Sequence, residues 1–272
     1  MLKLLFSGIA IGIANIIPGV SGGTIAFILG IYDKLTEAIG NFILAPKSKK
    51  IEYSKFLLPL FFGVGIGILL FAKIIEILYL KFPEPTSFFF IGLILASLPI
   101  ILKENKDKFS KSSITAFVFG VILVLIFLYF KKPSVILEVR TEFNLFYYIK
   151  LLLCGIVGAG AMIIPGISGS MLLLILGEYY NILSYINQLK IVPLIFVGIG
   201  VVIGIVLFSK LIAYFFSNFK NITISFITGL IIASIKGIWP GINLSNLFVN
   251  LLSLCLGCLV VYVSEKITLK KN

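Results

Sequence analysis

A short motif that occurs twice constrains the fold of this chain more than any other feature. Residues 15–24 read NIIPGVSGGT and residues 162–170 read MIIPGISGS; we call them the first and the second motif. Each copy interrupts an apolar stretch with a Pro-Gly pair. Within a membrane, such a break frees backbone N–H groups that hydrocarbon cannot satisfy, so it is tolerated only where it lines a cavity or meets a ligand. The two motifs therefore mark the predicted site.

The composition identifies an integral membrane protein. Of the 272 residues, 60% are hydrophobic and 12% are charged, and the mean hydropathy is +1.15, which leaves too little polar surface to cover a soluble globule. The net charge of +12 comes from lysines clustered between apolar runs, as in juxtamembrane segments, so nucleic acid is not an expected partner. The chain has no histidine and no carboxylate cluster with metal-ligand spacing, so we expect neither a metal site nor a cofactor.

The motifs belong to an internal duplication. Residues 8–32 recur at 155–179 with 13 identities in 25 positions. The likeness continues where FAK at 71–73 matches FSK at 208–210, and GLILAS at 92–97 matches GLIIAS at 229–234. Because the N-terminal segment has an internal copy, we expect it to belong to the fold and not to act as a cleaved signal peptide.

The apolar runs predict an all-α integral membrane protein built from two repeats within a single membrane domain. We expect the first repeat over residues 1–132, a linker over 133–144 and the second repeat over 145–272. Each repeat begins with a broken or re-entrant helical hairpin and continues with about three transmembrane helices. The sequence leaves open whether the segments beside each motif are half-helices or full spans. The predicted segments are 4–17, 24–45, 56–80, 86–103, 112–130, 145–164, 170–186, 191–216, 222–238 and 245–263.

The two repeats are expected to be inverted, because each half makes an odd number of net crossings. Inverted repeats with broken helices near the midplane are the plan of many secondary transporters. Loops on the side of the N-terminus hold more lysines than those on the other side, although the basic linker 131–150 lies on the other side. The positive-inside rule then predicts a multi-pass protein of the cytoplasmic membrane with both termini in the cytoplasm.

The chemistry of the motifs indicates an anion site. Proline ends the preceding helix, glycines allow a tight turn, and Ser21 or Ser168 is placed to cap the following helix. Free N–H groups, hydroxyls and the positive end of a helix dipole would then hold a phosphate-sized group, with the two motifs converging by symmetry. The predicted binding residues are Asn15, Pro18, Gly19, Ser21, Gly22, Gly23, Thr24, Pro165, Gly166, Ser168, Gly169 and Ser170.

Four charged residues are candidates for a role at the site, and three of them have an alternative interpretation. A single helix terminus contributes only about 0.3–2 kcal/mol, so Lys73 and Lys210, at equivalent positions of the two halves, are candidates for an assisting charge. The alternative is that both lysines snorkel to the interface. A titrating carboxylate at Glu178 or Asp33 would couple transport to protons or sodium. The alternative for Glu178 is an interfacial carboxylate beside tyrosines.

LGIY at 29–32 and LGEY at 176–179 follow the two motifs in the same way. With the motifs, they resemble a bacterial and archaeal membrane family long catalogued as a domain of unknown function, whose members have been assigned as undecaprenyl phosphate (polyprenyl phosphate) translocases. The likeness covers nearly the full length. KGIWP at 236–240 is similar to a basic-x-x-Trp-Pro segment of that family, where arginine is common. Lys236 keeps the charge without the bidentate geometry of arginine and is a third candidate for an assisting charge.

The resemblance implies a flippase that returns the polyprenyl phosphate carrier lipid from the outer to the cytoplasmic leaflet for reuse in cell-wall synthesis. The expected partners are this lipid and the membrane lipids; the oligomeric state stays open. The site would have to open sideways to lipid for the tail. A channel or exchanger for a small inorganic anion is the alternative, since chloride channels use similar turns, and a sensor or assembly partner without transport is another. A lipid phosphatase is not expected, because no serine has an evident base beside it.

Overall fold

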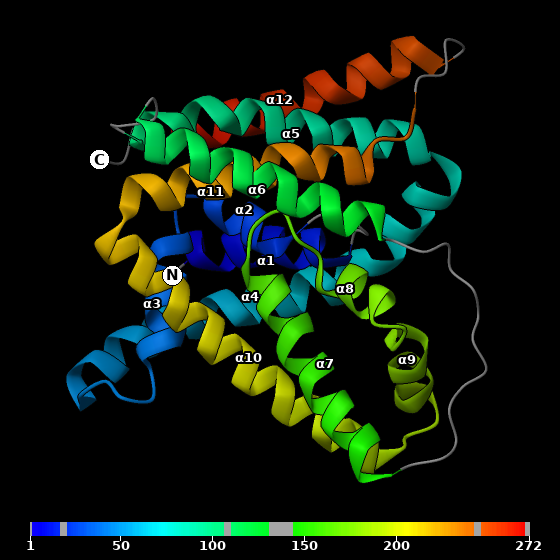
Figure 1. The fold of residues 1–272 in the computed structure, drawn as a ribbon. Coiled ribbons are helices and arrows are strands. Elements are labelled where there is room, and N and C mark those ends of the chain that lie inside the picture. The colour runs from blue at the N-terminus through cyan, green and yellow to red at the C-terminus, as the bar shows by residue number, and fades with distance from the viewer. Residues whose placement is uncertain (1, 17–20, 106–109, 131–143, 242–245, 270–272) are drawn as a thin grey trace.

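The computed structural model of the chain describes residues 2–16, 21–105, 110–130, 144–241 and 246–269, and these form twelve helices (Figure 1). The predicted all-α fold is confirmed. The helices are α1 (Leu2–Ile16), α2 (Gly22–Ile28), α3 (Tyr32–Asn41), α4 (Lys47–Lys81), α5 (Pro83–Glu104), α6 (Lys111–Tyr129), α7 (Leu145–Ile163), α8 (Gly169–Ile175), α9 (Tyr179–Asn187), α10 (Ile191–Asn218), α11 (Lys220–Ile238) and α12 (Leu247–Leu269).

In the described part of the chain, six helices are long and apolar enough to cross a membrane, namely α4 over Lys47–Phe71, α5, α6, α7, α10 and α11. Only 17% of the most apolar window of α6, and the same share of that of α10, is buried inside the protein. An exposed apolar surface of this extent requires lipid around it. The chain is therefore an integral membrane protein, as predicted.

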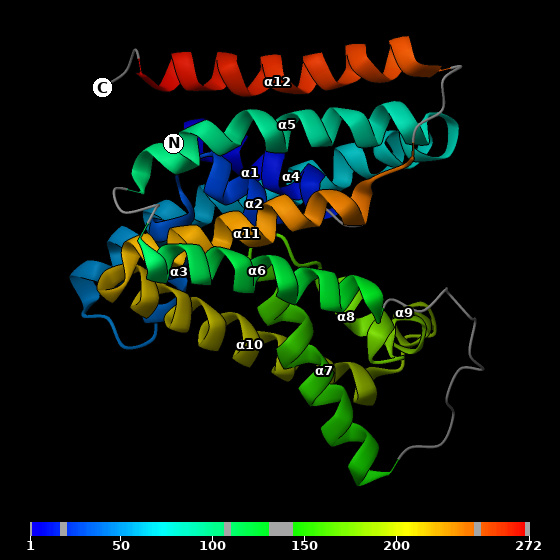
Figure 2. The same ribbon diagram turned by 45° about the horizontal axis from the view of Figure 1, so that its top comes forward.

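The helices of the second half repeat the order of the first. α1 packs against α4 as α7 packs against α10, while α5 pairs with α12 and α6 with α11 (Figure 2). Glycines bring the backbones close at these crossings. A Cβ atom added to Gly8 would lie 2.1 Å from the carbonyl oxygen of Leu60, and one added to Gly200 would lie 2.1 Å from that of Leu152. Small residues at such crossings allow the close van der Waals packing that joins helices in lipid.

Two predicted apolar segments are each divided into two short helices, α2 with α3 and α8 with α9. Gly30 and Gly177 end the first helix of each pair with φ values of 66° and 74°, a left-handed conformation that glycine adopts readily. The next residue, Ile31 or Glu178, donates its N–H to a carbonyl oxygen of the preceding helix at 3.1 or 2.9 Å. This is the Schellman arrangement of helix ends. The segments predicted at 24–45 and 170–186 therefore each contain two helices.

The short helices decide between the two hairpin forms that the sequence left open. α2 and α8 have seven residues each, far fewer than the roughly 20 that a spanning helix needs. The N-terminus and α3 lie on one side of the molecule, and α9 lies with the beginning of α7 on the opposite side (Figures 1 and 2). Each motif therefore lies in a broken hairpin, which favours half-helices over full spans.

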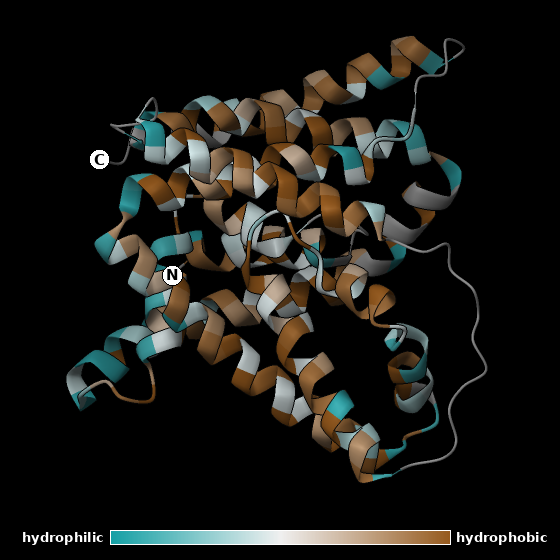
Figure 3. Ribbon diagram, viewed as in Figure 1, coloured by the Kyte–Doolittle hydropathy of each residue, from teal (hydrophilic) through white to brown (hydrophobic). Residues whose placement is uncertain are grey.

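Hydrophobic residues run along the long helices, whereas hydrophilic residues gather around α3, at the beginning of α4 and at several other helix ends (Figure 3). This distribution separates an apolar middle zone from polar ends. The motifs, with their breaks and hydroxyl groups, lie between these ends, which is where an irregular backbone needs polar partners within the protein.

Candidate functional site

The two motifs meet at one cavity of about 460 Å³. The rest of its wall is mainly apolar and comes from α1, α3, α4, α7, α8 and α10. A few polar groups in an apolar wall are typical of a site for a small ligand or head group. The predicted binding residues that line the cavity are Asn15, Ser21, Gly22, Gly23, Ser168, Gly169 and Ser170.

Hydrogen bonds join the two motifs directly. The Gly166 N–H donates to the Thr24 hydroxyl oxygen at 2.9 Å, and the Ser21 hydroxyl donates to the Ile164 carbonyl oxygen at 3.3 Å. Both bonds satisfy groups of one motif with groups of the other. The breaks in the two hairpins thus stabilise each other inside the protein.

Ser21 and Ser168 occupy the N-cap positions of α2 and α8 as predicted, but neither side chain accepts a capping hydrogen bond. The Ser21 hydroxyl points to a carbonyl of the other motif, and the Ser168 hydroxyl lies 2.8 Å from that of Ser170. The prediction that these serines cap the helices was therefore wrong, because other polar groups of the site engage their side chains.

Asn15 supplies the first hydrogen bond to α2. Its Oδ1 accepts the Gly22 N–H at 3.0 Å. The N–H groups of Gly23, Gly169 and Ser170 have no acceptor within the described parts of the chain, and all three residues line the cavity. Such first-turn N–H groups lack partners within their own helix, so they are available to an anionic group in the cavity.

Close packing of the backbone requires some of the glycines in the motifs, independently of any ligand. A Cβ atom added to Gly23 would lie 2.5 Å from the Ile163 carbonyl oxygen, and one added to Gly169 would lie 2.4 Å from the Gly158 carbonyl oxygen. Gly166 has a φ of 84°, which disfavours other residues. These glycines therefore allow close backbone packing, between the two hairpins at Gly23 and within the second hairpin at Gly169, in addition to lining the cavity.

The remaining predicted binding residues do not line the cavity. Thr24, Pro165 and Gly166 are buried behind its wall, where they hold the two motifs together. Pro18 and Gly19 lie outside the described residues.

The three lysines predicted to assist the site are exposed, and none of them lines the cavity. Lys210 borders a separate cleft of about 380 Å³, together with Asp33 and Glu37 of α3. Lys73 lies on α4, and Lys236 lies in the last turn of α11. These exposed positions fit the alternative in which a long side chain carries its ammonium group to the membrane interface.

Glu178 is buried inside the protein, with 2% of its surface exposed. It forms an ion pair with Lys150 and accepts hydrogen bonds from the Tyr147 hydroxyl at 2.7 Å and the Asn181 amide at 2.9 Å. The Tyr147 hydroxyl lies 2.9 Å from that of Tyr185. A buried carboxylate needs this degree of pairing. Its place in LGEY identifies Glu178 in the sequence, whereas no signal in the sequence identifies its partners.

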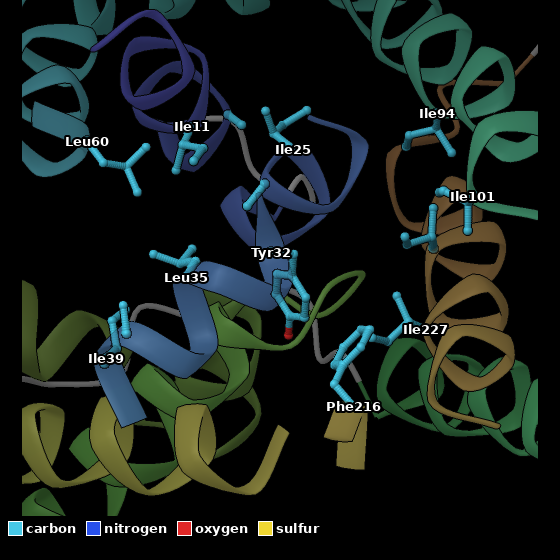
Figure 4. Packing of buried hydrophobic residues seen from close by; sticks show 14 of the residues in the cluster. Ile11, Ile25, Tyr32, Leu35, Ile39, Leu60, Ile94, Ile101, Phe216 and Ile227 are labelled. Carbon is cyan, nitrogen blue, oxygen red and sulfur yellow. The ribbon is translucent and has the colours of Figure 1, made fainter. Parts of the chain in front are cut away.

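Tyr32 is a residue of the site that the motif analysis missed. It lines the cavity with 1% of its surface exposed, and its hydroxyl donates to the Ile163 carbonyl oxygen at 2.9 Å. Its ring packs edge-on against Phe216, with centroids 5.8 Å apart (Figure 4). The available signal was its place at the end of LGIY, which recurs with Tyr179.

α3 covers one side of the cavity, and its counterpart α9 does not cover the other. Leu35 and Ile39 of α3 line the cavity with Leu60 of α4 (Figure 4). α3 also packs on α10 so closely that a Cβ atom added to Gly40 would lie 2.6 Å from the Lys210 Cα. Among the described residues, α9 lines no part of the cavity and makes no comparable contact with α4. The two halves therefore differ in how they close the site.

The sequence of the chain is similar to those of two transporters. The chain is 34% identical to a polyprenyl-phosphate transporter of Vibrio cholerae over 251 residues, which cover 88% of this chain and 78% of the relative. It is 29% identical to a polyprenyl-phosphate transporter of Staphylococcus aureus over 275 residues, which cover 97% of this chain and 96% of the relative. No solved structure matches the chain. Residues 11–259 match the undecaprenyl phosphate translocase-like family, and the chain belongs to this family.

Proposed function

We propose that this protein moves polyprenyl phosphate from the outer to the cytoplasmic leaflet of the cytoplasmic membrane, with the phosphate held between the two motifs. The relatives named polyprenyl-phosphate transporters supply the substrate class. The observation that carries the proposal is the convergence of two duplicated motifs on one cavity.

The phosphate would accept hydrogen bonds from the N–H groups of Gly23, Gly169 and Ser170 and from the hydroxyl groups of Ser168 and Ser170. Hydrogen bonds to a charged group contribute about 1.5–3 kcal/mol each, so a set of them offsets the several kcal/mol that removing an anion from water costs. Among the described residues, no charged side chain lines the cavity. A neutral site of this kind suits a transporter, because it can bind the head group and still release it.

The proposed path uses two inverted repeats. α3 and α9 lie on opposite sides of the molecule (Figure 1), and lysines at the beginning of α4 follow α3 after a short loop. The positive-inside rule would place that side, and both termini, in the cytoplasm. In inverted repeats, the contact between α3 and α10 has a counterpart between α9 and α4. Exchange of the first contact for the second would close the outer side and open the cytoplasmic side.

Glu178 is the group that would couple this exchange to an ion. It lies directly before α9, the helix that would move, and its partners Lys150 and Tyr147 lie on α7. Protonation of the carboxylate, or its pairing with sodium, would weaken the ion pair between the two helices. Because a buried charge is costly without its partner, the packing of α9 would respond to the ion.

Leaflet exchange of polyprenyl phosphate in proteoliposomes, with and without a pH gradient, tests the function. Replacement of Ser21, Gly22, Ser168 and Gly169 by leucine should abolish binding of this lipid, whereas Ser112→Leu, on an exposed position of α6, should leave it unchanged. Equal binding by the parent protein and the fourfold variant would show that the phosphate does not bind at the motifs.

The same vesicles separate the alternatives. We propose transport without catalysis, because the chain has no histidine and no carboxylate of the described residues lines the cavity beside a serine to act as a base. Release of inorganic phosphate from the lipid would contradict this. Flux of a small inorganic anion through vesicles that lack any lipid phosphate would favour the channel or exchanger over the flippase.

A further inference from the structure

We propose that the isoprenoid tail of the substrate leaves the cavity through a seam between α4 and α10 and lies there against lipid. This inference rests on the proposed function and adds a binding site for the tail to that of the phosphate. The seam is formed by Leu60, Phe61, Val64, Val197, Val201 and Ile205, all of which line the cavity.

The packing of the helices leaves this seam open. α4 is joined to α1 and α10 is joined to α7 by extensive contacts, but α4 and α10 make no comparable contact with each other in the described residues. Glycines lock the two joined pairs, as at Gly63 and Gly200, where an added Cβ atom would lie 2.2 and 2.1 Å from a carbonyl oxygen of the partner helix. The seam is therefore a boundary between two tightly packed units.

The wall of the seam runs from the interior to the lipid-facing surface. Leu60 is 1% exposed, and the next residue, Phe61, is 52% exposed, yet both line the cavity. Across the seam, Val197 and Val201 are both partly exposed. A continuous lining that includes buried and exposed residues connects the cavity with the surface of α4 and α10, which are spanning helices.

The polarity along this wall matches a lipid with a phosphate head. The side chains of the seam are apolar, and the hydroxyl and N–H groups of the cavity belong to the motifs and to Tyr32. Pockets of about 300–1,000 Å³ enclose drug-sized ligands, so a cavity of about 460 Å³ does not enclose a phosphate with a long isoprenoid chain. The chain must leave the cavity, and an apolar exit into lipid costs it no exposure to water.

Photocrosslinking tests where the tail lies. A benzoylphenylalanine at Phe61 should form an adduct with polyprenyl phosphate that excess polyprenyl phosphate removes and excess polyprenol, which lacks the phosphate, does not. The matched position is Leu58, which is 69% exposed on the same helix and does not line the cavity. Its adduct should not respond to either competitor. The same lack of competition at Phe61, in a protein that binds the lipid, would overturn the seam.

A steric variant gives an independent readout. Val201→Trp should weaken binding of long-chain polyprenyl phosphate about tenfold or more, and should leave binding of a water-soluble short-chain prenyl phosphate within about twofold. Leu207→Trp, at an exposed position of α10 away from the cavity, is the control. Equal losses of binding for both lipids, or no loss for either, would contradict the proposed tail site at the seam and leave the proposed function intact. Failure of the parent protein to bind polyprenyl phosphate would instead overturn the proposed function, and the seam with it.

Discussion

The backbone N–H of Gly166 donates a hydrogen bond of 2.9 Å to the hydroxyl of Thr24. This bond joins the break of the second hairpin to α2 of the first hairpin. The two residues are 142 positions apart. Neither lines the cavity. The bond therefore holds the two walls of the site together from behind.

Replacement of Thr24 by valine should loosen this junction. Valine keeps the shape but leaves the buried Gly166 N–H without an acceptor, which costs about 1–3 kcal/mol. We expect a lower thermal unfolding midpoint in detergent and weaker binding of polyprenyl phosphate. Thr115→Val, at an exposed position of α6, is the control and should change neither. An unchanged midpoint for Thr24→Val would show that the bond does not stabilise the junction.

Replacement of Gly23 by alanine should separate the motifs sterically. The added Cβ atom would lie 2.5 Å from the Ile163 carbonyl oxygen, and overpacking of this kind costs about 1–3 kcal/mol. The matched variant is Gly65→Ala on α4, where an added Cβ atom meets nothing within 4 Å and alanine favours the helix. Thermal unfolding should show a loss for the first variant and none for the second. Equal midpoints would contradict the close packing.

Replacement of Glu178 by glutamine should remove the ion pair with Lys150 and keep hydrogen bonding to Tyr147 and Asn181. We expect leaflet exchange to lose its dependence on the pH gradient while the protein still folds, because the glutamine side chain keeps the shape. Glu52→Gln is the control, since Glu52 forms exposed ion pairs that contribute little. A gradient dependence that persists in Glu178→Gln would exclude this carboxylate as the coupling group.

Replacement of Gly40 by alanine should push α3 away from α10, because the new Cβ atom would lie 2.6 Å from the Lys210 Cα. Cys154 lines the cavity and is buried, so it reports on access. In a background with Cys255 and Cys258 changed to serine, a small thiol reagent should modify Cys154 faster in the Gly40 variant. Gly65→Ala serves again as the control. An unchanged rate would indicate that α3 does not close the cavity.

Several features of the fold follow from the sequence directly. The length of the apolar runs predicts the spanning helices, because a helix must be that long to cross hydrocarbon. The Pro-Gly pairs predict the two breaks, and the duplication predicts that the halves share one helix order. The division at Gly30 and Gly177 was missed, although a glycine after a helix is a known stop signal.

The sequence did not predict contacts between residues that lie far apart in the chain. The serine hydroxyls were expected to cap their own helices, since local hydrogen bonding is the simplest use of a serine before a helix. The structure instead turns Ser21 to Ile164 and gives the capping contact to Asn15. The burial of Glu178 likewise depends on side chains of α7. The sequence does not show that α7 packs beside this residue.

The sequence by itself determined that this protein lies in a membrane, that its helices come in two similar sets, and that each set is broken at a Pro-Gly motif. Only the tertiary structure decided that the two breaks share one cavity, that α3 and not α9 covers it, and that the lysines stay outside. The physical reason is that hydropathy and local backbone chemistry act over one helix at a time. Convergence depends instead on how glycine-lined helices from opposite halves pack against one another.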